Sequence, residues 1–113
     1  MTVYIFNTLI VPLASEYKRG TILLERITIE EAKQLVQSTD FVSAVGHEGT
    51  AKLLSQILDV NIPTNRIAVH LLKGDIGLHF VLKQRLPEGK ILTYDELKTL
   101  QYELIKTTVI DVE

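Results

Sequence analysis

The sequence predicts an α+β or α/β fold, in which a mixed β-sheet of about five strands is flanked by helices. The chain has 113 residues, a length that fits one domain with a core of its own. Apolar runs typical of strands are interspersed with segments of helical spacing, which favours a sheet packed against helices. No repeat, low-complexity tract or linker divides the sequence, so we predict a single domain over residues 1–113.

The composition excludes several classes of protein. Hydrophobic residues make up 46% and charged residues 23%, which is typical of a globular protein. A net charge of −2 argues against a protein whose main task is to coat duplex DNA, although a small basic site is compatible with it. There is no cysteine, so there is no disulfide framework and no thiolate zinc site. The apolar N-terminal stretch lacks a basic n-region and is too short to span a bilayer, so we expect an intracellular protein.

The N-terminal third of the chain predicts two strands and one helix. The run "VYIFN" (Val3–Asn7) is apolar until its last residue, as in a central strand buried on both faces. A second strand is predicted at Thr21–Thr28. Thr28 followed by Glu31 has the spacing of a capping box, which predicts a helix over residues 29–38.

The middle of the chain predicts a second helix and a hairpin. Apolar residues at helical spacing predict a helix from Glu48 to Leu58, ended by "NIPTN". Further on, Gly74 and Asp75 are typical of a two-residue hairpin loop. That loop would give the paired strands one apolar face. The residues of this face would be Ile67, Val69 and Leu71 opposite Leu82, Phe80 and Leu78.

The C-terminal segment predicts a third helix and a last strand. Thr93 followed by Glu96 repeats the capping-box spacing and opens a predicted helix over residues 94–101. The run "YELIKTTVIDV", residues 102–112, predicts the last strand. We therefore expect strands and helices in a single mixed sheet with its helices packed against it.

His47 lies between two glycines in "VGHEGT", just ahead of the second predicted helix. The first N–H groups of a helix attract anions, and Gly46 and Gly49 let a ligand approach the backbone. A histidine there can donate a proton to a leaving oxygen near neutral pH. The alternative is an ordinary turn residue, which the spacing alone does not exclude.

Arg85 ends the strand candidate that precedes the loop "RLPEGK". The planar guanidinium of an arginine stabilises phosphoryl transition states through its fork of donors. Glu88 could orient a histidine or a ribose hydroxyl, and Lys90 adds a second cation to the loop. The alternative is a solvated turn with local charge pairs.

Asn7 ends the first predicted strand. In open sheets, ligands collect at the carboxyl ends of the strands. An amide at that position could bind a base edge or a phosphate, and the alternative is that it caps a turn.

His70 and His79 become cross-strand neighbours in the predicted hairpin. Two imidazoles without a carboxylate make an incomplete metal site, because catalytic zinc usually has three protein ligands. We therefore expect paired polar groups on a sheet face and no metal. The sequence also has no P-loop, dinucleotide fingerprint or nucleophile elbow.

Four segments occur in an order that resembles a known family: "YIFNTLIVPL", "VGHEGTAKLLS", "IPTNR" and "QRLPEGKILTYDEL". The chain resembles the small archaeal-virus proteins that act as type III anti-CRISPR ring nucleases. The resemblance runs through most of the chain, and "GHEGTA" and "RLPEGK" are its most specific segments. Some members have a polar side chain shortly after the strand-ending Asn. Ile10 and Val11 are apolar, so that side chain has no counterpart here.

The resemblance implies a homodimer that binds cyclic tetra-adenylate, the second messenger of type III CRISPR complexes, across its two-fold axis. Each half would cut one linkage without a metal or other cofactor, which would disarm the effector nucleases in the host cytoplasm. In matching positions it implies catalytic roles for His47, Arg85 and Glu88. The implied ligand contacts are Asn7, Gly49, Thr50 and Arg66.

The implied chemistry is coherent without a metal, because RNA carries its own nucleophile in the ribose 2′-hydroxyl. Arg85 would neutralise charge that develops on the phosphoryl oxygens, and His47 would protonate the leaving 5′-oxygen. The products would be linear di-adenylates with 2′,3′-cyclic phosphate ends. A basic side chain near the two-fold axis is contributed by both protomers, so an acidic protein can still form a locally positive pocket.

The sequence is compatible with two other functions. The basic residues Lys83, Arg85 and Lys90 are also compatible with a viral regulatory dimer that binds DNA or a host protein without catalysis. Duplex DNA is the less favoured partner, because the chain as a whole is acidic. The other alternative function is to sequester the messenger without cutting it.

Overall fold

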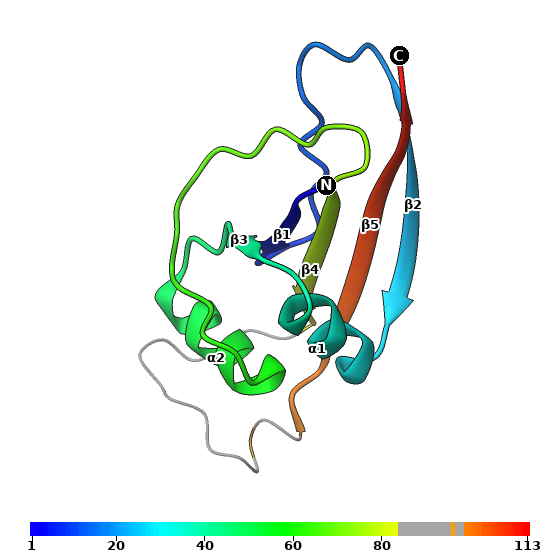
Figure 1. Ribbon diagram of the computed structural model, residues 1–113. Coiled ribbons are helices and arrows are strands. Elements are labelled where there is room, and N and C mark those ends of the chain that lie inside the picture. The colour runs from blue at the N-terminus through cyan, green and yellow to red at the C-terminus, as the bar shows by residue number, and fades with distance from the viewer. Residues whose placement is uncertain (84–95, 97–98) are drawn as a thin grey trace.

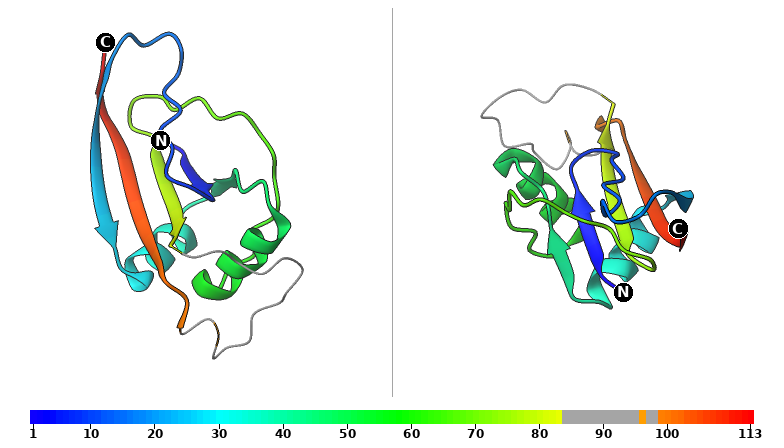
Figure 2. Two further views of the ribbon diagram at one scale, coloured as in Figure 1. Left: turned by 180° about the vertical axis from the view of Figure 1, so that it is seen from behind. Right: turned by 90° about the horizontal axis from the view of Figure 1, so that it is seen from above.

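The computed structural model describes residues 1–83, 96 and 99–113. Within these residues the chain forms a five-stranded sheet with helices packed on one face (Figure 1). In the view from behind, the strands pass in front of α1 (Figure 2). In chain order the elements are β1 (Val3–Phe6), β2 (Gly20–Ile27), α1 (Ile29–Gln37), β3 (Phe41–Ser43), α2 (Glu48–Leu58), β4 (Ile76–Leu82) and β5 (Tyr102–Val112).

The sheet is mixed, and its strand order is β2-β5-β4-β1-β3. β1 pairs in parallel with β3 on one side and with β4 on the other. β5 pairs antiparallel with both β4 and β2. The carboxyl ends of β1, β3 and β4 therefore meet at a single edge of the sheet, and this edge is where ligands collect in open sheets.

The larger apolar cluster lies between the sheet and the two helices. Ile5 of β1 and Leu78 and Phe80 of β4 point toward this layer, where they meet Leu54 and Leu58 of α2. All five side chains are almost fully buried. At about 25 cal/mol per Å² of buried apolar surface, this cluster supplies much of the free energy that holds α1 and α2 on the sheet.

A smaller apolar cluster covers part of the opposite face of the sheet. Phe6 of β1 and Val109 of β5 pack there against Val69 and Leu71, which lie outside the named strands. Leu71 is held in place by an isolated parallel bridge to Leu13. The sheet thus has a core on both faces, although the helices of the described residues, α1 and α2, cover only one of them.

Several sequence predictions are confirmed. The fold class, the strand at residues 102–112 and the helix at Glu48–Leu58 are as expected. The capping box of α1 is present, because the Thr28 hydroxyl accepts from the Glu31 N–H and the Glu31 carboxylate accepts from the Thr28 N–H, both at 3.1 Å. The first strand is central, as its apolar run predicted.

The predicted hairpin around Gly74 and Asp75 is wrong. A turn does form there, since Gly74 has a φ of 89° and the Asp75 carboxylate accepts from the Leu72 N–H at 2.9 Å. However, residues 67–71 are not a strand beside β4, whose partners are β1 and β5. The fifth strand is instead β3, which the sequence did not suggest.

The physical reason lies in the two faces of the sheet. Leu78 and Phe80 belong to the helix-covered cluster, whereas Val69 and Leu71 belong to the cluster on the opposite face. The two sets therefore do not share one face, as the hairpin would require. Most of the predicted helix over residues 94–101 lies outside the described residues. Glu96 and Thr99 within it are helical.

We predict that Thr28→Ala lowers the free energy of unfolding by about 1 kcal/mol, because the first turn of α1 loses its capping hydroxyl. Thr28→Ser keeps the hydroxyl and should remain close to the parent protein. Equilibrium urea denaturation of the three proteins measures the difference. An alanine variant as stable as the serine variant would show that the capping box contributes nothing.

Candidate functional site

The candidate site lies at the carboxyl edge of the three parallel strands. Asn7 follows β1 directly, and the loop 44–47 follows β3. Because Ile5 pairs with Ser43, Asn7 and Val45 each lie two residues beyond the same cross-strand pair. The Ala44 N–H donates to the Ile5 carbonyl at 2.8 Å, so the two chains still adjoin as they leave the sheet. The half-buried Asn7 is thus placed beside the loop that leads to His47.

His47 is the N-cap residue of α2. Its backbone is extended, with φ −122° and ψ 125°, and its carbonyl accepts the first helical bond from the Ala51 N–H at 3.0 Å. Its side chain makes no capping hydrogen bond and is exposed. The imidazole is therefore available to a ligand at the mouth of the helix, whereas Ser, Thr, Asp or Asn would normally occupy a capping position.

Gly49 and Thr50 lie in the first turn of α2, where backbone N–H groups have no partner within the helix. Gly49 is exposed, and a Cβ added to it would meet no other atom within 4 Å. Packing of the described residues therefore does not require a glycine there. A glycine at this position does let an anion approach the N–H groups and the positive end of the helix dipole closely.

Arg66 lies against the same helix mouth, although it is far from His47 in sequence. Its Nε donates to the carbonyl of Gly46 at 2.9 Å. A Cβ on Gly46 would lie 3.3 Å from the Arg66 Cγ, so the small residue makes room for the arginine stem. Within the described part of the chain, no carboxylate forms an ion pair with Arg66. Its charge is thus available to an anionic ligand.

Asn65 holds this arrangement together, and sequence reasoning did not identify it. Its N–H donates to the Val45 carbonyl and its side-chain amide donates to the Ser43 carbonyl, both at 2.8 Å. The Ser43 hydroxyl donates in turn to the Pro63 carbonyl at 2.6 Å. These bonds fix the segment before Arg66 to the end of β3. The turn sequence "IPTNR" was the available signal, but it does not reveal which strand the asparagine contacts.

Comparison with known proteins assigns the chain to a family. A sequence model of the STIV B116-like family matches residues 3–104. The chain belongs to the STIV B116-like family. It is 45% identical over 111 residues to uncharacterized protein 26 of Sulfolobus islandicus filamentous virus (isolate Iceland/Hveragerdi), covering 97% of this chain and 93% of that protein. It is also 31% identical over 113 residues to uncharacterized protein YddF of Bacillus subtilis (strain 168), covering 98% and 100%.

The fold of this B116-like chain is shared by a solved structure. B116 of Sulfolobus turreted icosahedral virus superposes with a TM-score of 0.81, covering 96% of this chain and 99% of that one. The sequence identity is 24%, so this match bears on the fold alone. Relatives of the chain thus occur in an archaeal virus and in a bacterium.

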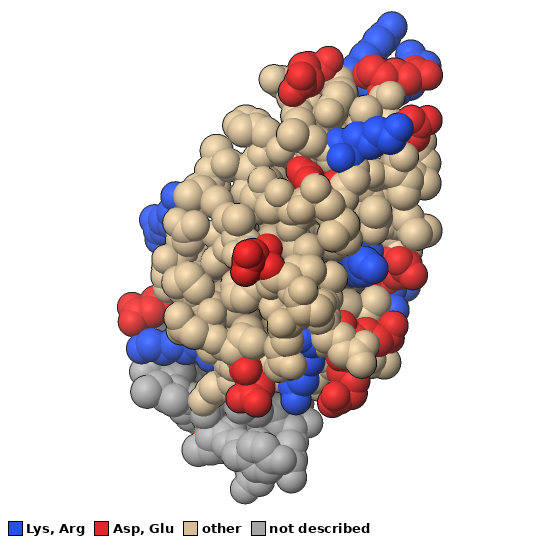
Figure 3. Space-filling model, in the orientation of Figure 1, with Lys and Arg blue, Asp and Glu red and all other residues tan. Residues whose placement is uncertain are grey.

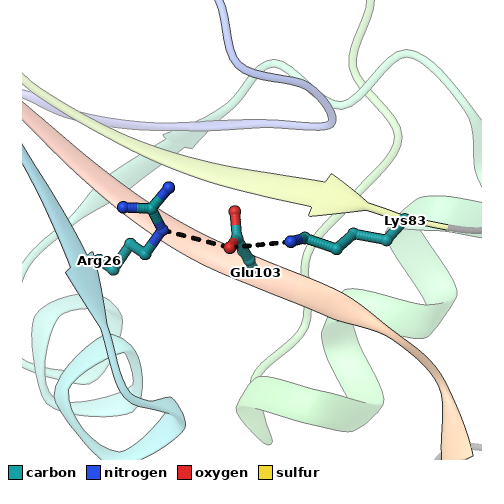
Figure 4. Close-up of polar contacts among 3 residues, drawn as sticks. All are labelled: Arg26, Lys83 and Glu103. Carbon is teal, nitrogen blue, oxygen red and sulfur yellow. Dashed lines mark hydrogen bonds and ion pairs between the residues drawn. The ribbon is translucent and has the colours of Figure 1, made fainter.

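Arg85 and Glu88 of this B116-like chain lie outside the described residues, as does Lys90. Lys83, which follows β4 at the carboxyl edge, is described. Its Nζ lies 3.0 Å from a Glu103 oxygen that also accepts from the Arg26 Nε at 3.2 Å (Figure 4). Hydrogen bonds from Lys83 and then Arg26 lower the pKa of Glu103. Lys83 is therefore already paired, in a cluster where one carboxylate is shared by two cations.

Charges on the helix-covered face are mixed. Figure 3 shows acidic and basic side chains scattered around a middle with little charge. The described part of this face shows no stripe of one sign, which a protein that tracks duplex DNA would usually present. No helix among the described residues is long and apolar enough to cross a membrane.

The predicted pairing of His70 with His79 is wrong. His70 is exposed and lies outside the strands, whereas His79 is buried in β4. The Nδ1 of His79 lies 3.1 Å from the Thr8 carbonyl oxygen, and its Nε2 lies 2.8 Å from the Thr107 hydroxyl. The two histidines are therefore not cross-strand neighbours, because the hairpin that would have paired them does not form.

We predict that stability falls as the pH drops below about 6.5, the ordinary pKa of histidine. Burial lowers the pKa of His79, so the unfolded chain takes up a proton that the folded chain does not. The free energy of unfolding should fall with a slope approaching 1.4 kcal/mol per pH unit, as an order-of-magnitude limit.

Urea denaturation at pH 7.5 and 5.5 measures this dependence, and His79→Asn should largely remove it. The pKa of Glu103 is lowered instead, so its contribution to stability is present above about pH 4.5 and is lost only as the pH falls through its folded value. The two effects therefore act in separate ranges of pH. Equal pH dependence in both proteins would rule out His79 as the cause.

Proposed function

We propose that this protein is a metal-independent ring nuclease that binds cyclic tetra-adenylate as a homodimer. It would cleave the ring to linear di-adenylates with 2′,3′-cyclic phosphate ends and thereby inhibit type III CRISPR defence. The observation that carries the proposal is the convergence of Asn7, His47 and Arg66 at one edge of the sheet, at the open mouth of α2. The resemblance of "GHEGTA" and "RLPEGK" to the ring nucleases supplies the substrate.

The geometry suits a phosphodiester. The first-turn N–H groups of Gly49 and Thr50 and the guanidinium of Arg66 are donors for phosphate oxygens. Asn7 offers an amide to a base or a ribose at the same edge. A cyclic tetranucleotide brings both phosphates and ribose hydroxyls to the site, so the nucleophile arrives with the substrate.

In the proposed step the ribose 2′-oxygen bonds to phosphorus as the P–O5′ bond breaks, and the 2′-hydroxyl proton passes to water. His47 would serve as the general acid for the leaving 5′-oxygen and would regain its proton from water. Arg85 would neutralise charge on the phosphoryl oxygens, and Glu88 would orient His47 or a ribose hydroxyl. In sequence, Arg85 and Glu88 come shortly after Lys83, which follows β4 at the same edge as Asn7 and His47. Their roles in this chain rest on the resemblance to the ring nucleases.

A second copy of the chain would complete the site. Cyclic tetra-adenylate has repeated symmetry, so a two-fold dimer can present one His47 and one Arg66 to each half of the ring. Doubling these groups across an axis concentrates positive potential in a protein with a net charge of −2. The messenger is made inside the host cell, so the proposal puts the protein in the host cytoplasm.

The competing function is a regulatory dimer that binds DNA or a host protein without catalysis. Its motivation is weaker than the sequence suggested, because Lys83 is engaged by Glu103. Tight duplex binding with a steep salt dependence, in a dimer that leaves cyclic tetra-adenylate intact, would favour it. A protein that only sequesters the messenger would return the intact ring after incubation, which chromatography detects.

We predict that His47→Ala lowers the rate of cleavage by roughly two to four powers of ten, because the leaving oxygen loses its proton donor. The variant should still form a dimer and bind the ring. Single-turnover assays in EDTA with chromatography of the products measure the rate. His70→Ala removes another exposed histidine and should cleave at the parent rate.

Undiminished cleavage by His47→Ala would contradict the role of His47. Loss of parent activity in EDTA would contradict the metal-independent mechanism instead. The two outcomes separate the catalytic residue from the class of chemistry.

We predict that Arg66→Ala raises the KM for the ring by roughly tenfold or more, the usual worth of a charged hydrogen bond. The effect on kcat should be smaller, because Arg66 is expected to bind substrate without taking part in proton transfer. Arg19→Ala is the matched control, since Arg19 is also exposed but pairs with Glu113 away from the helix mouth. Equal KM values for the two variants would remove Arg66 from the binding site.

A further inference from the structure

A buried polar cluster joins β1, β4 and β5 on the face of the sheet opposite the helices. Its centre is His79, whose side chain is 0% exposed. The imidazole stacks on the Phe6 ring, with a centroid distance of 5.0 Å and an interplanar angle of 9°. Thr107, at 1% exposure, lies beside it. None of these groups has a part in the proposed chemistry, so their polarity needs another explanation.

The hydrogen bonds of His79 fit one tautomer. A carbonyl oxygen only accepts, so the Nδ1 that lies 3.1 Å from the Thr8 oxygen must donate to it. In a neutral imidazole the Nε2 is then an acceptor, and the Thr107 hydroxyl donates to it at 2.8 Å. Both ring nitrogens are thereby satisfied in the neutral form. This agrees with burial, which lowers the pKa of His79.

Gly77 provides the space for this ring. A Cβ on Gly77 would lie 2.6 Å from the His79 Nε2 and 2.8 Å from the Thr107 hydroxyl oxygen. The imidazole cannot easily move aside, because Phe6 stacks against it. The glycine, the histidine and the threonine are therefore fitted to one another, and the ring has a defined position in the sheet.

The Thr8 carbonyl that accepts from His79 lies immediately after Asn7. The pairing of β1 with β4 ends at Phe6 and His79. Beyond the strand the chain becomes exposed: Phe6 is 2% exposed, whereas Leu9 is 40% and Ile10 is 46% exposed. The bond from His79 therefore ties the chain to the sheet at the point where its strand pairing stops.

We propose that His79 is a positioning residue of the candidate site: by holding the Thr8 carbonyl it fixes the direction in which the chain leaves β1, and so places the Asn7 amide for a cyclic nucleotide. This inference rests on the proposed function. His79 is too deeply buried to contact the ligand. Its effect would appear in substrate binding and not in the chemical step.

The test compares His79→Asn with His79→Gln. The amide nitrogen of Asn falls near the position of Nδ1 and can still reach the Thr8 carbonyl, whereas that of Gln falls near Nε2. Hydrogen exchange of a peptide that spans residues 7–11 and steady-state kinetics with cyclic tetra-adenylate are measured at a temperature where all variants are folded. His79→Gln should raise both the exchange rate and the KM about tenfold, the effect of one lost hydrogen bond. The kcat should change less than about twofold, and His79→Asn should resemble the parent on both readouts.

Thr107→Val is the matched control, because it removes a hydrogen bond to the same ring and leaves the Thr8 contact. It should lower stability without changing exchange in residues 7–11 or the KM. If it acts like His79→Gln, the cluster is merely structural and the proposal is overturned. Parent-like exchange and KM in His79→Gln would overturn it as well.

A measurement on the parent protein needs no variant. Nitrogen-15 NMR of the ring should show His79 protonated at Nδ1 and bare at Nε2, and the opposite tautomer would overturn the proposal. If the parent protein neither binds nor cuts the ring, the proposed function fails. The exchange and tautomer measurements still decide whether His79 holds the segment after Asn7.

Discussion

The central strand β1 is paired along both of its sides, and most of the molecule follows from that constraint. Its parallel neighbours β3 and β4 each require a long crossover, because the chain must return before it can run in the same direction again. α1 precedes β3 and α2 precedes β4, and both helices pack on the same face of the sheet. The same parallel pairing brings the strand ends to one edge, so the site is a consequence of how β1 is buried.

Local signals predicted the parts of the fold that are determined locally. Thr28 and Glu31 marked the start of α1 because a capping box is made within one turn. β3 was missed because three residues are too few to show a period. Gly74 does form a turn, but the partner of β4 depends on which apolar face meets which cluster, and no local pattern contains that information.

In the candidate site, too, features set by local sequence were predicted and features set by long-range contacts were not. His47 was identified because a histidine between glycines ahead of a helix is a local pattern, and it is the N-cap residue of α2, although its side chain makes no capping hydrogen bond. The docking of Arg66 on Gly46 was not predictable by spacing, because it depends on Asn65 reaching the end of β3. Likewise, His79 was paired with His70 as a cross-strand neighbour, because its real partners, Thr8 and Thr107, are distant in sequence.

The distribution of charge explains how an acidic chain could attract a polyanion. Lys83 shares the Glu103 carboxylate with Arg26, and Lys52 pairs with Glu48. The Lys52 pair is one to one and contributes little field at a distance, whereas Arg66 has no ion-pair partner among the described residues. Among the described residues, the open helix mouth and the unpaired Arg66 thus contribute positive potential at the carboxyl edge, and the net charge of the chain says little about it.

The ion pair between Arg26 and Glu103 also affects the outer edge of the sheet. β2 is an edge strand, and Leu23 and Leu24 on it are 47% and 48% exposed. Such a strand is a template for unwanted pairing with another chain, unless charges interrupt it. Glu25 and Arg26 follow the two leucines directly, and Arg26 is held by Glu103 on the neighbouring strand. The ion pair therefore also disfavours edge-to-edge aggregation. A strand that paired with β2 through its two exposed leucines would have to accommodate the charge of Arg26 beside them.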